Sequence, residues 1–108
     1  MNSSRLEALK KFLEEEPNDI FTRYAIALEY ASMQNLPEAI AKLEEVIAFD
    51  PNYVPAYQQL GSYLRQAGRK DDALKILERG IQVAALVGDT HAQGEMQEAI
   101  DDLEDANS

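Results

Sequence analysis

The stretch Ile20–Tyr53 reads IFTRYAIALEYASMQNLPEAIAKLEEVIAFDPNY. It contains two helix-forming segments with a short break between them, and a second break follows the second segment. Asn35 precedes Pro37 and Glu38, the order expected of an N-cap, a proline in the first turn and a glutamate at the capping position. Pro51 ends the second segment, because proline lacks an N–H and disfavours a helical residue before it. The stretch therefore predicts a helical hairpin.

Residues Val54–Val87 repeat the plan of this hairpin, with Val54 in the place of Ile20. We call this shift along the chain the repeat offset. It aligns apolar residues with apolar ones and small residues with small ones, in the pairs Ala39 with Ala73, Leu43 with Leu77, Ile47 with Ile81 and Ala27 with Gly61. Small residues let two antiparallel helices approach closely, which accounts for Gly61 and Gly80 in helices despite a propensity cost of about 1 kcal/mol each.

Single helices are predicted on both sides of the two hairpins. The first has Leu6, Leu9 and Leu13 on one face, a capping-box spacing at Ser4 and Glu7, and a stop at Pro17. The last follows Gly88-Asp89, a stop and an N-cap. Its single apolar stripe comprises Ala92, Met96, Ala99, Ile100 and Leu103. A helix with one apolar face suits the end of a repeat stack.

The first helix of the first hairpin has two apolar sides. At about 100° per residue, one side carries Ile26, Tyr30 and Met33, and the opposite side carries Phe21, Tyr24 and Leu28. Such a helix must be covered on both sides or expose a patch to a partner.

The first helix of the second hairpin differs, because only one of its faces is apolar. That face carries Tyr57, Leu60, Gly61 and Leu64, and the polar face carries Gln58, Gln59, Ser62, Arg65 and Gln66. Gly68 follows as the left-handed residue expected after the end of this helix.

With these residues in place, the chain resembles the tetratricopeptide repeat family, in particular its small bacterial-type members. The family's order of residues matches as Tyr57, Leu60-Gly61, Leu64, Ala73 and Leu77 in the second unit, and as Ile26-Ala27, Tyr30, Ala39, Leu43 and Pro51 in the first. Two positions depart from it, since Arg23 stands where an aromatic residue is expected and Ala85 where a proline is expected.

The resemblance implies an all-α, α-α superhelix of six antiparallel helices in a single domain over residues 1–108. Its expected parts are a half-repeat helix at 1–17, one repeat at 20–53, a second at 54–87 and a C-terminal capping helix at 89–105.

The resemblance also implies a concave groove lined by the first helix of each hairpin. Carried onto this sequence, the groove residues are Phe21, Tyr24, Leu28 and Ala31, then Pro55, Gln58, Ser62 and Arg65. The expected function is a non-catalytic protein–protein interaction module that binds a peptide segment or helix of a partner. Two alternatives remain open. The chain's own last helix covers the apolar patch, or the patch joins two copies in a structural homo-oligomer, such as a homodimer.

One subclass of the family grips a C-terminal carboxylate with Lys and Asn on its groove helices. The corresponding positions here hold Tyr24, Leu28 and Gln59, so no such clamp is expected. Arg65 alone remains suited to meet a carboxylate, because its guanidinium matches that geometry.

Composition narrows the remaining classes. The formal net charge is −10, which argues against a nucleic-acid surface and fits either solubility or a basic partner. The absence of cysteine excludes disulfides and thiolate zinc sites. The N-terminus lacks the apolar core of a signal peptide, and no apolar run approaches the thickness of a bilayer. The expectation is a cytoplasmic protein that binds neither membrane nor nucleic acid.

Catalytic and metal chemistry are not expected. His91, with Glu95 and Glu98, is a formal metal constellation, but a second helix would have to supply further ligands, so a first-turn surface residue is the preferred interpretation. The sequence has no glycine-rich phosphate loop, nucleophile elbow or Cys–His pair. We therefore expect no enzyme activity, cofactor or metal.

Overall fold

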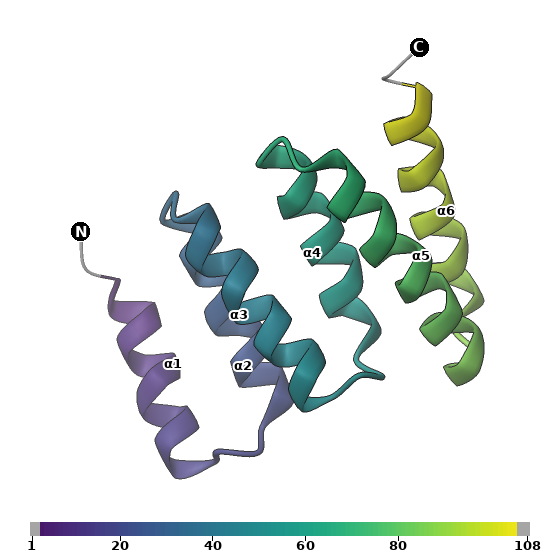
Figure 1. Ribbon diagram of the computed structural model, residues 1–108. Helices are drawn as coiled ribbons and strands as arrows, with labels where there is room; N and C mark the ends of the chain where they lie inside the picture. The colour runs from purple at the N-terminus through teal and green to yellow at the C-terminus, as the bar shows by residue number, and fades with distance from the viewer. Residues whose placement is uncertain (1–2, 106–108) are drawn as a thin grey trace. The chain divides into compact units, whose positions relative to one another are not determined.

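The computed structural model describes residues 3–105, which form helices and no strands (Figure 1). The helices are α1 (Ser4–Glu15), α2 (Ile20–Ser32), α3 (Leu36–Phe49), α4 (Val54–Gln66), α5 (Lys70–Val87) and α6 (Thr90–Asp105). They divide after Asp50 into two compact units, α1 to α3 and α4 to α6. The predicted fold class, an all-α helical repeat, is confirmed. The grouping of both units into one domain stays a prediction.

In the first unit, α2 packs against both α1 and α3. Ala27 and Ala39 are fully buried where small residues were expected, and Leu43 and Ile47 of α3 are buried with them. Asn35 accepts the backbone N–H of Glu38, so the predicted cap of α3 is confirmed. The predicted hairpin is therefore present, with its apolar stripe in the core.

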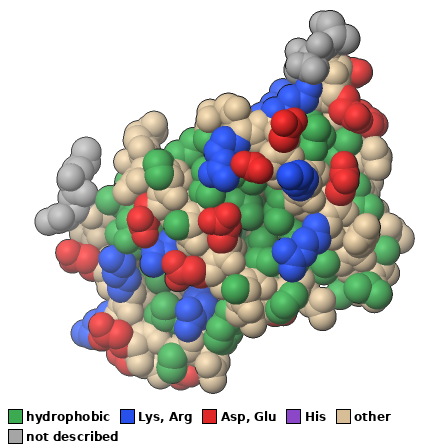
Figure 2. Space-filling view, viewed as in Figure 1, with side chains coloured by type: hydrophobic (Ala, Val, Ile, Leu, Met, Phe, Trp, Pro, Cys, Tyr) green, Lys and Arg blue, Asp and Glu red, His purple; other side chains and the backbone are tan. Residues whose placement is uncertain are grey.

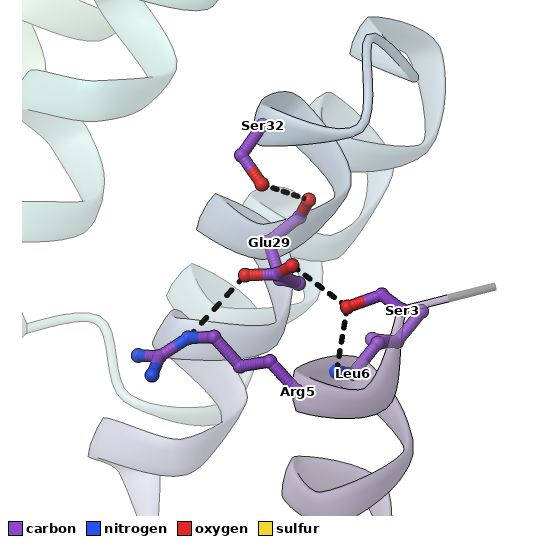
Figure 3. A network of polar contacts seen from close by, with 5 residues as sticks. All are labelled: Ser3, Arg5, Leu6, Glu29 and Ser32. Carbon is purple, nitrogen blue, oxygen red and sulfur yellow. Dashed lines mark hydrogen bonds and ion pairs between the residues drawn. The ribbon is translucent and has the colours of Figure 1, made fainter. Parts of the chain in front are cut away.

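The N-cap of α1 is Ser3, so the predicted capping box at Ser4 and Glu7 was wrong. The Ser3 hydroxyl accepts the Leu6 N–H at 3.0 Å and donates to Glu29 Oε2 of α2 at 2.8 Å (Figure 3). A capping box describes one helix alone, whereas this hydroxyl also gains a bond to a second helix. The residue that caps α1 is therefore Ser3, which also contacts Glu29, and not Ser4.

Glu29 joins α1 to α2 by two contacts. Besides the Ser3 hydroxyl, Arg5 Nε lies 3.3 Å from Glu29 Oε1, as Figure 3 shows. The Glu29 side chain is only 15% exposed, so these charge-assisted contacts lie in a partly dry environment where they are stronger than at an open surface.

The turns inside the two hairpins share one backbone geometry. Gln34 has φ 64° and its counterpart in the second repeat, Gly68, has φ 77°. A left-handed residue ends each first helix, as predicted for Gly68. In the first repeat the same conformation is imposed on a residue with a side chain, which is unfavourable.

In the second unit, α5 packs against α4 and α6 with glycines at the contacts. A Cβ at Gly61 would lie 2.6 Å from Leu77 Cδ2, and one at Gly80 would lie 2.7 Å from Tyr57 Cβ and 2.6 Å from Met96 Sδ. The predicted close approach at these glycines is confirmed. At the end of α5, Gly88 is left-handed with φ 79°, as expected of a stop.

Replacing Gln34 by Gly should stabilise the protein by about 0.5–1 kcal/mol, because glycine removes the strain of the left-handed conformation at a smaller entropic cost. Gly68→Ala should destabilise it by about 1 kcal/mol, since a Cβ there meets nothing within 4 Å and only the backbone conformation opposes it. Urea unfolding measures both changes. A less stable Q34G protein would contradict the account of this turn.

Gly80→Ala should cost about 1–3 kcal/mol, because the new methyl group overlaps Tyr57 and Met96 in a packed core. Gly94→Ala is the matched control. Gly94 lies within α6, where an added Cβ meets nothing within 4 Å, so the change should stabilise by about 0.5–1 kcal/mol. Equal effects of the two substitutions on the free energy of unfolding would argue against close packing at Gly80.

Candidate functional site

The predicted binding stripe of α2 is accessible along its length. Phe21 is 64% exposed, and Tyr24, Leu28 and Ala31 are half-buried. They share one side of α2 because they recur at the spacing of a helical face. Apolar side chains are thus left partly open to solvent, and the stripe is not sealed.

The opposite side of α2 is occupied by the core of the first unit. Ile26 is 4% exposed, and Tyr30 and Met33 are half-buried on the same side. The two-sided pattern predicted for this helix is therefore present, with the more complete burial on the Ile26 side. The packing of the hairpin accounts for the stripe that contains Ile26. The stripe that contains Phe21 contributes less to the core.

The polar face predicted for α4 is present in the second unit. Pro55, Ser62 and Arg65 are exposed and Gln58 is half-buried, while Tyr57, Leu60 and Leu64 on the other face are buried. This helix begins after Tyr53, which makes no side-chain capping hydrogen bond, and it has a proline in its first turn. The pattern of alternating faces in the sequence was sufficient to separate the two sides.

Three of the four predicted α4 residues line one pocket of about 150 Å³. Gln58, Ser62 and Arg65 contribute polar groups to it. Its apolar lining comes from three helices, through Gly61 of α4, Leu77 of α5, and Ala99 and Leu103 of α6. Pro55 does not line this pocket. Whether it joins the α2 stripe in a single groove stays a prediction.

Helix α6 contributes more to this site than the sequence indicated. Ala99 and Leu103 were expected only as part of a capping stripe, yet they line the pocket. Gln58 Nε2 also donates to Glu95 Oε1 of α6 at 3.1 Å. The repeat offset does not align the apolar stripe of α6 with that of α4, because it takes Leu60 to Gly94 and Leu64 to Glu98. It therefore gave no signal for Ala99 and Leu103.

The pocket offers hydrogen-bond donors beside apolar surface. The Ser62 hydroxyl accepts from Gln66 Nε2 at 3.2 Å, so its own proton is available to an acceptor. Within residues 3–105, Arg65 forms no ion pair, and it lies in the last turn of α4, where the helix dipole favours a cation. An amide, a hydroxyl and a guanidinium therefore surround a small apolar floor.

Tyr63 was not singled out from the sequence, although it is 8% exposed. Burial raises the pKa of its phenol above the usual value. It neighbours Ser62 in the sequence but lies on the buried side of α4, so its role is packing. The polar residues beside it in the sequence obscured that role.

His91 is exposed, with Nε2 3.4 Å from Glu95 Oε2 one turn away. Within the part of the chain that the structure describes, no group of three or more histidine, aspartate or glutamate side chains is placed to hold a metal ion. Over the same residues, no helix combines the length and apolar character needed to cross a membrane.

Comparison with known proteins agrees with the helical-hairpin architecture. A TPR repeat-containing protein of Pseudomonas aeruginosa is 28% identical over 91 residues, which are 84% of this chain and 87% of that protein. A tetratricopeptide repeat domain protein of Salinibacter ruber, solved by NMR, is 39% identical with a TM-score of 0.78, covering 82% of this chain and 89% of that one.

A third similarity concerns the fold alone. The TPR2B domain of yeast Sti1, in its complex with pHsp70, has a TM-score of 0.85 at 23% identity and covers 94% of this chain and 81% of that one. The sequence pattern of the tetratricopeptide repeat family matches residues 30–86, which is more than half of the chain. The chain belongs to the tetratricopeptide repeat family.

Proposed function

We propose that this protein is a non-catalytic interaction module that holds a peptide segment or helix of another protein. The family and its fold are generally those of scaffolds rather than enzymes. The observation that carries the proposal is the apolar stripe of Phe21, Tyr24, Leu28 and Ala31, with Phe21 64% exposed on a helix whose opposite side carries the buried Ile26.

The α4 pocket offers polar groups to a bound segment. A bound segment has backbone carbonyl groups, and the donors of Gln58, Ser62 and Arg65 are chemically suited to them. Aromatic and aliphatic side chains of the segment would pack on the α2 stripe, where burial of apolar area provides affinity. Pro55, exposed in the first turn of α4, belongs to the same proposed set of binding residues.

The similarity to the Sti1 domain supports this class of ligand by analogy. That domain was solved in a complex with pHsp70. The positions of the carboxylate-gripping residues differ here, with Tyr24, Leu28 and Gln59 in their place. A segment bound through side-chain anchors therefore fits this chain better than one bound by its terminal carboxylate.

The test uses peptides selected from a displayed library with the whole chain as bait. Phe21→Ser should lower the affinity for the selected peptides by about 10- to 100-fold, because burying one phenylalanine side chain contributes about 1.5–3 kcal/mol. Leu86→Ser is the matched control, since Leu86 is 82% exposed on α5 and outside the proposed site. Calorimetry should show unchanged affinity for L86S. Equal losses for the two variants, or no loss for F21S, would count against the proposal.

Self-association through the same stripe is the second candidate, favoured by the exposure of Phe21. It makes a separate prediction. Light scattering over a dilution series would show a mass that falls with dilution for the unaltered chain and a constant monomer mass for F21S. A monomer mass at every concentration of the unaltered chain would rule this candidate out.

A further inference from the structure

A second pocket, of about 130 Å³, lies within the first unit among α1, α2 and α3. Three cationic side chains line it, Lys10 of α1, Arg23 of α2 and Lys42 of α3. Glu45 is the acidic residue in its lining, and Leu13, Ile26 and Val46 supply the apolar surface. In a chain with 20 acidic and 10 basic residues, this is a local reversal of charge.

The three cations differ in their pairing with carboxylates. Lys42 Nζ lies 3.5 Å from Glu45 Oε2 and 3.8 Å from Glu38 Oε1. Lys10 Nζ lies 5.6 Å from the centre of the Tyr30 ring. Within residues 3–105, neither Lys10 nor Arg23 forms an ion pair. On the face drawn in Figure 2, basic side chains lie over α1 and α3 with acidic ones beside them.

Arg23 also has an unsatisfied donor. Its Nη2 donates to the Pro17 carbonyl at 2.8 Å, and its guanidinium lies 4.3 Å from the centre of the Phe49 ring. Its Nε is buried and, among the described residues, has no hydrogen-bond partner. Buried donors without partners are rare in folded proteins, and such a group calls for an explanation.

The repeat shows that the hairpin does not need these charges. At the repeat offset, the positions of the three cations are occupied by Glu44, Tyr57 and Ile76. Tyr57 Oη donates to the Pro51 carbonyl at 2.7 Å, and Pro51 is the counterpart of Pro17. A neutral side chain thus makes the same hydrogen bond in the second repeat, so this hydrogen bond does not account for the positive charge of Arg23.

We propose that this pocket binds a carboxylate on a short aliphatic stem, namely a glutamate side chain presented by a partner peptide. Lys10, Arg23 and Lys42 would meet the carboxylate, and Leu13, Ile26 and Val46 would pack on its methylene groups. A fully hydrated anion such as inorganic phosphate gains nothing from that apolar surface. The planar donors of an arginine match the geometry of a carboxylate better than the compact ammonium group of a lysine does.

This site is independent of the function proposed above. Arg23 and Ile26 lie on the side of α2 opposite to Phe21, Tyr24 and Leu28, as their spacing at about 100° per residue requires. Occupation of one site can therefore be measured without the other. F21S protein should bind the glutamate peptide as the unaltered chain does.

The test is an NMR titration of the whole chain with the peptide acetyl-Gly-Glu-Gly-amide, against acetyl-Gly-Gln-Gly-amide. The Arg23 Nε–H signal can be assigned from its absence in an Arg23→Tyr variant. The glutamate peptide should shift this signal and the Val46 methyl signals in a saturable way, and the glutamine peptide should not. Equal shifts with both peptides, or none with the first, would overturn the proposal.

Variants provide the second arm of this experiment. Arg23→Tyr introduces the residue that the second repeat has at this position, so the variant should fold. Its affinity for the glutamate peptide, measured from the Val46 methyl shifts, should be at least tenfold lower. Lys10→Met should weaken it as well, which keeps the test valid if R23Y does not fold. Lys11→Met makes the same charge change at an exposed position outside the pocket and should have little effect.

Retained binding in both R23Y and K10M would show that the cations do not hold the ligand and would overturn the proposal. So would a larger shift with inorganic phosphate than with the glutamate peptide at the same concentration, because the apolar lining would then have no part in binding.

Discussion

The close approach of helices at small residues is the constraint on which both units depend. Ala27 and Ala39 are fully buried in the first unit, and Gly61 and Gly80 leave no room for a Cβ in the second. Small residues at these positions let neighbouring helices pack closely, so that most of the buried apolar side chains lie on the faces that meet. The outer stripe of α2 and the polar face of α4 are therefore not fixed by the packing of the hairpin, and they can differ between repeats.

The two repeats differ at the positions that line the cationic pocket of the first unit. Tyr57 is fully buried, and Arg79 lies with its guanidinium 5.5 Å from the centre of the Tyr57 ring. At the corresponding positions the first repeat has Arg23 and Glu45, which line a pocket instead of filling it with an aromatic ring. One backbone plan thus supports a packed aromatic residue in one unit and a cationic pocket in the other.

Much of the fold could be predicted because its signals are local. Proline, capping residues and the spacing of apolar residues placed the helices, and the repeat offset identified the hairpins. The predictions that failed depended on contacts between helices. Ser3 rather than Ser4 caps α1 in the presence of Glu29 on another helix, and no local pattern contains that contact. The left-handed Gln34 was hidden for a similar reason, since only its alignment with Gly68 indicates the conformation.

The candidate site was predicted only in part. The sequence separated the faces of α2 and α4, because polarity changes along each helix with helical spacing. It did not show that Ala99 and Leu103 of α6 complete the pocket around Ser62 and Arg65, since a stripe of apolar residues on a last helix has the same pattern whether it only caps the core or also lines a site.

The central claim is the proposal that a partner segment binds to the apolar stripe of α2. Intermolecular nuclear Overhauser effects between a selected peptide and the whole chain test it most directly. The account predicts contacts from the peptide to the rings of Phe21 and Tyr24 and to the methyl groups of Leu28. Contacts confined to other exposed apolar residues, such as Leu86 and Val87 at the end of α5, would contradict it.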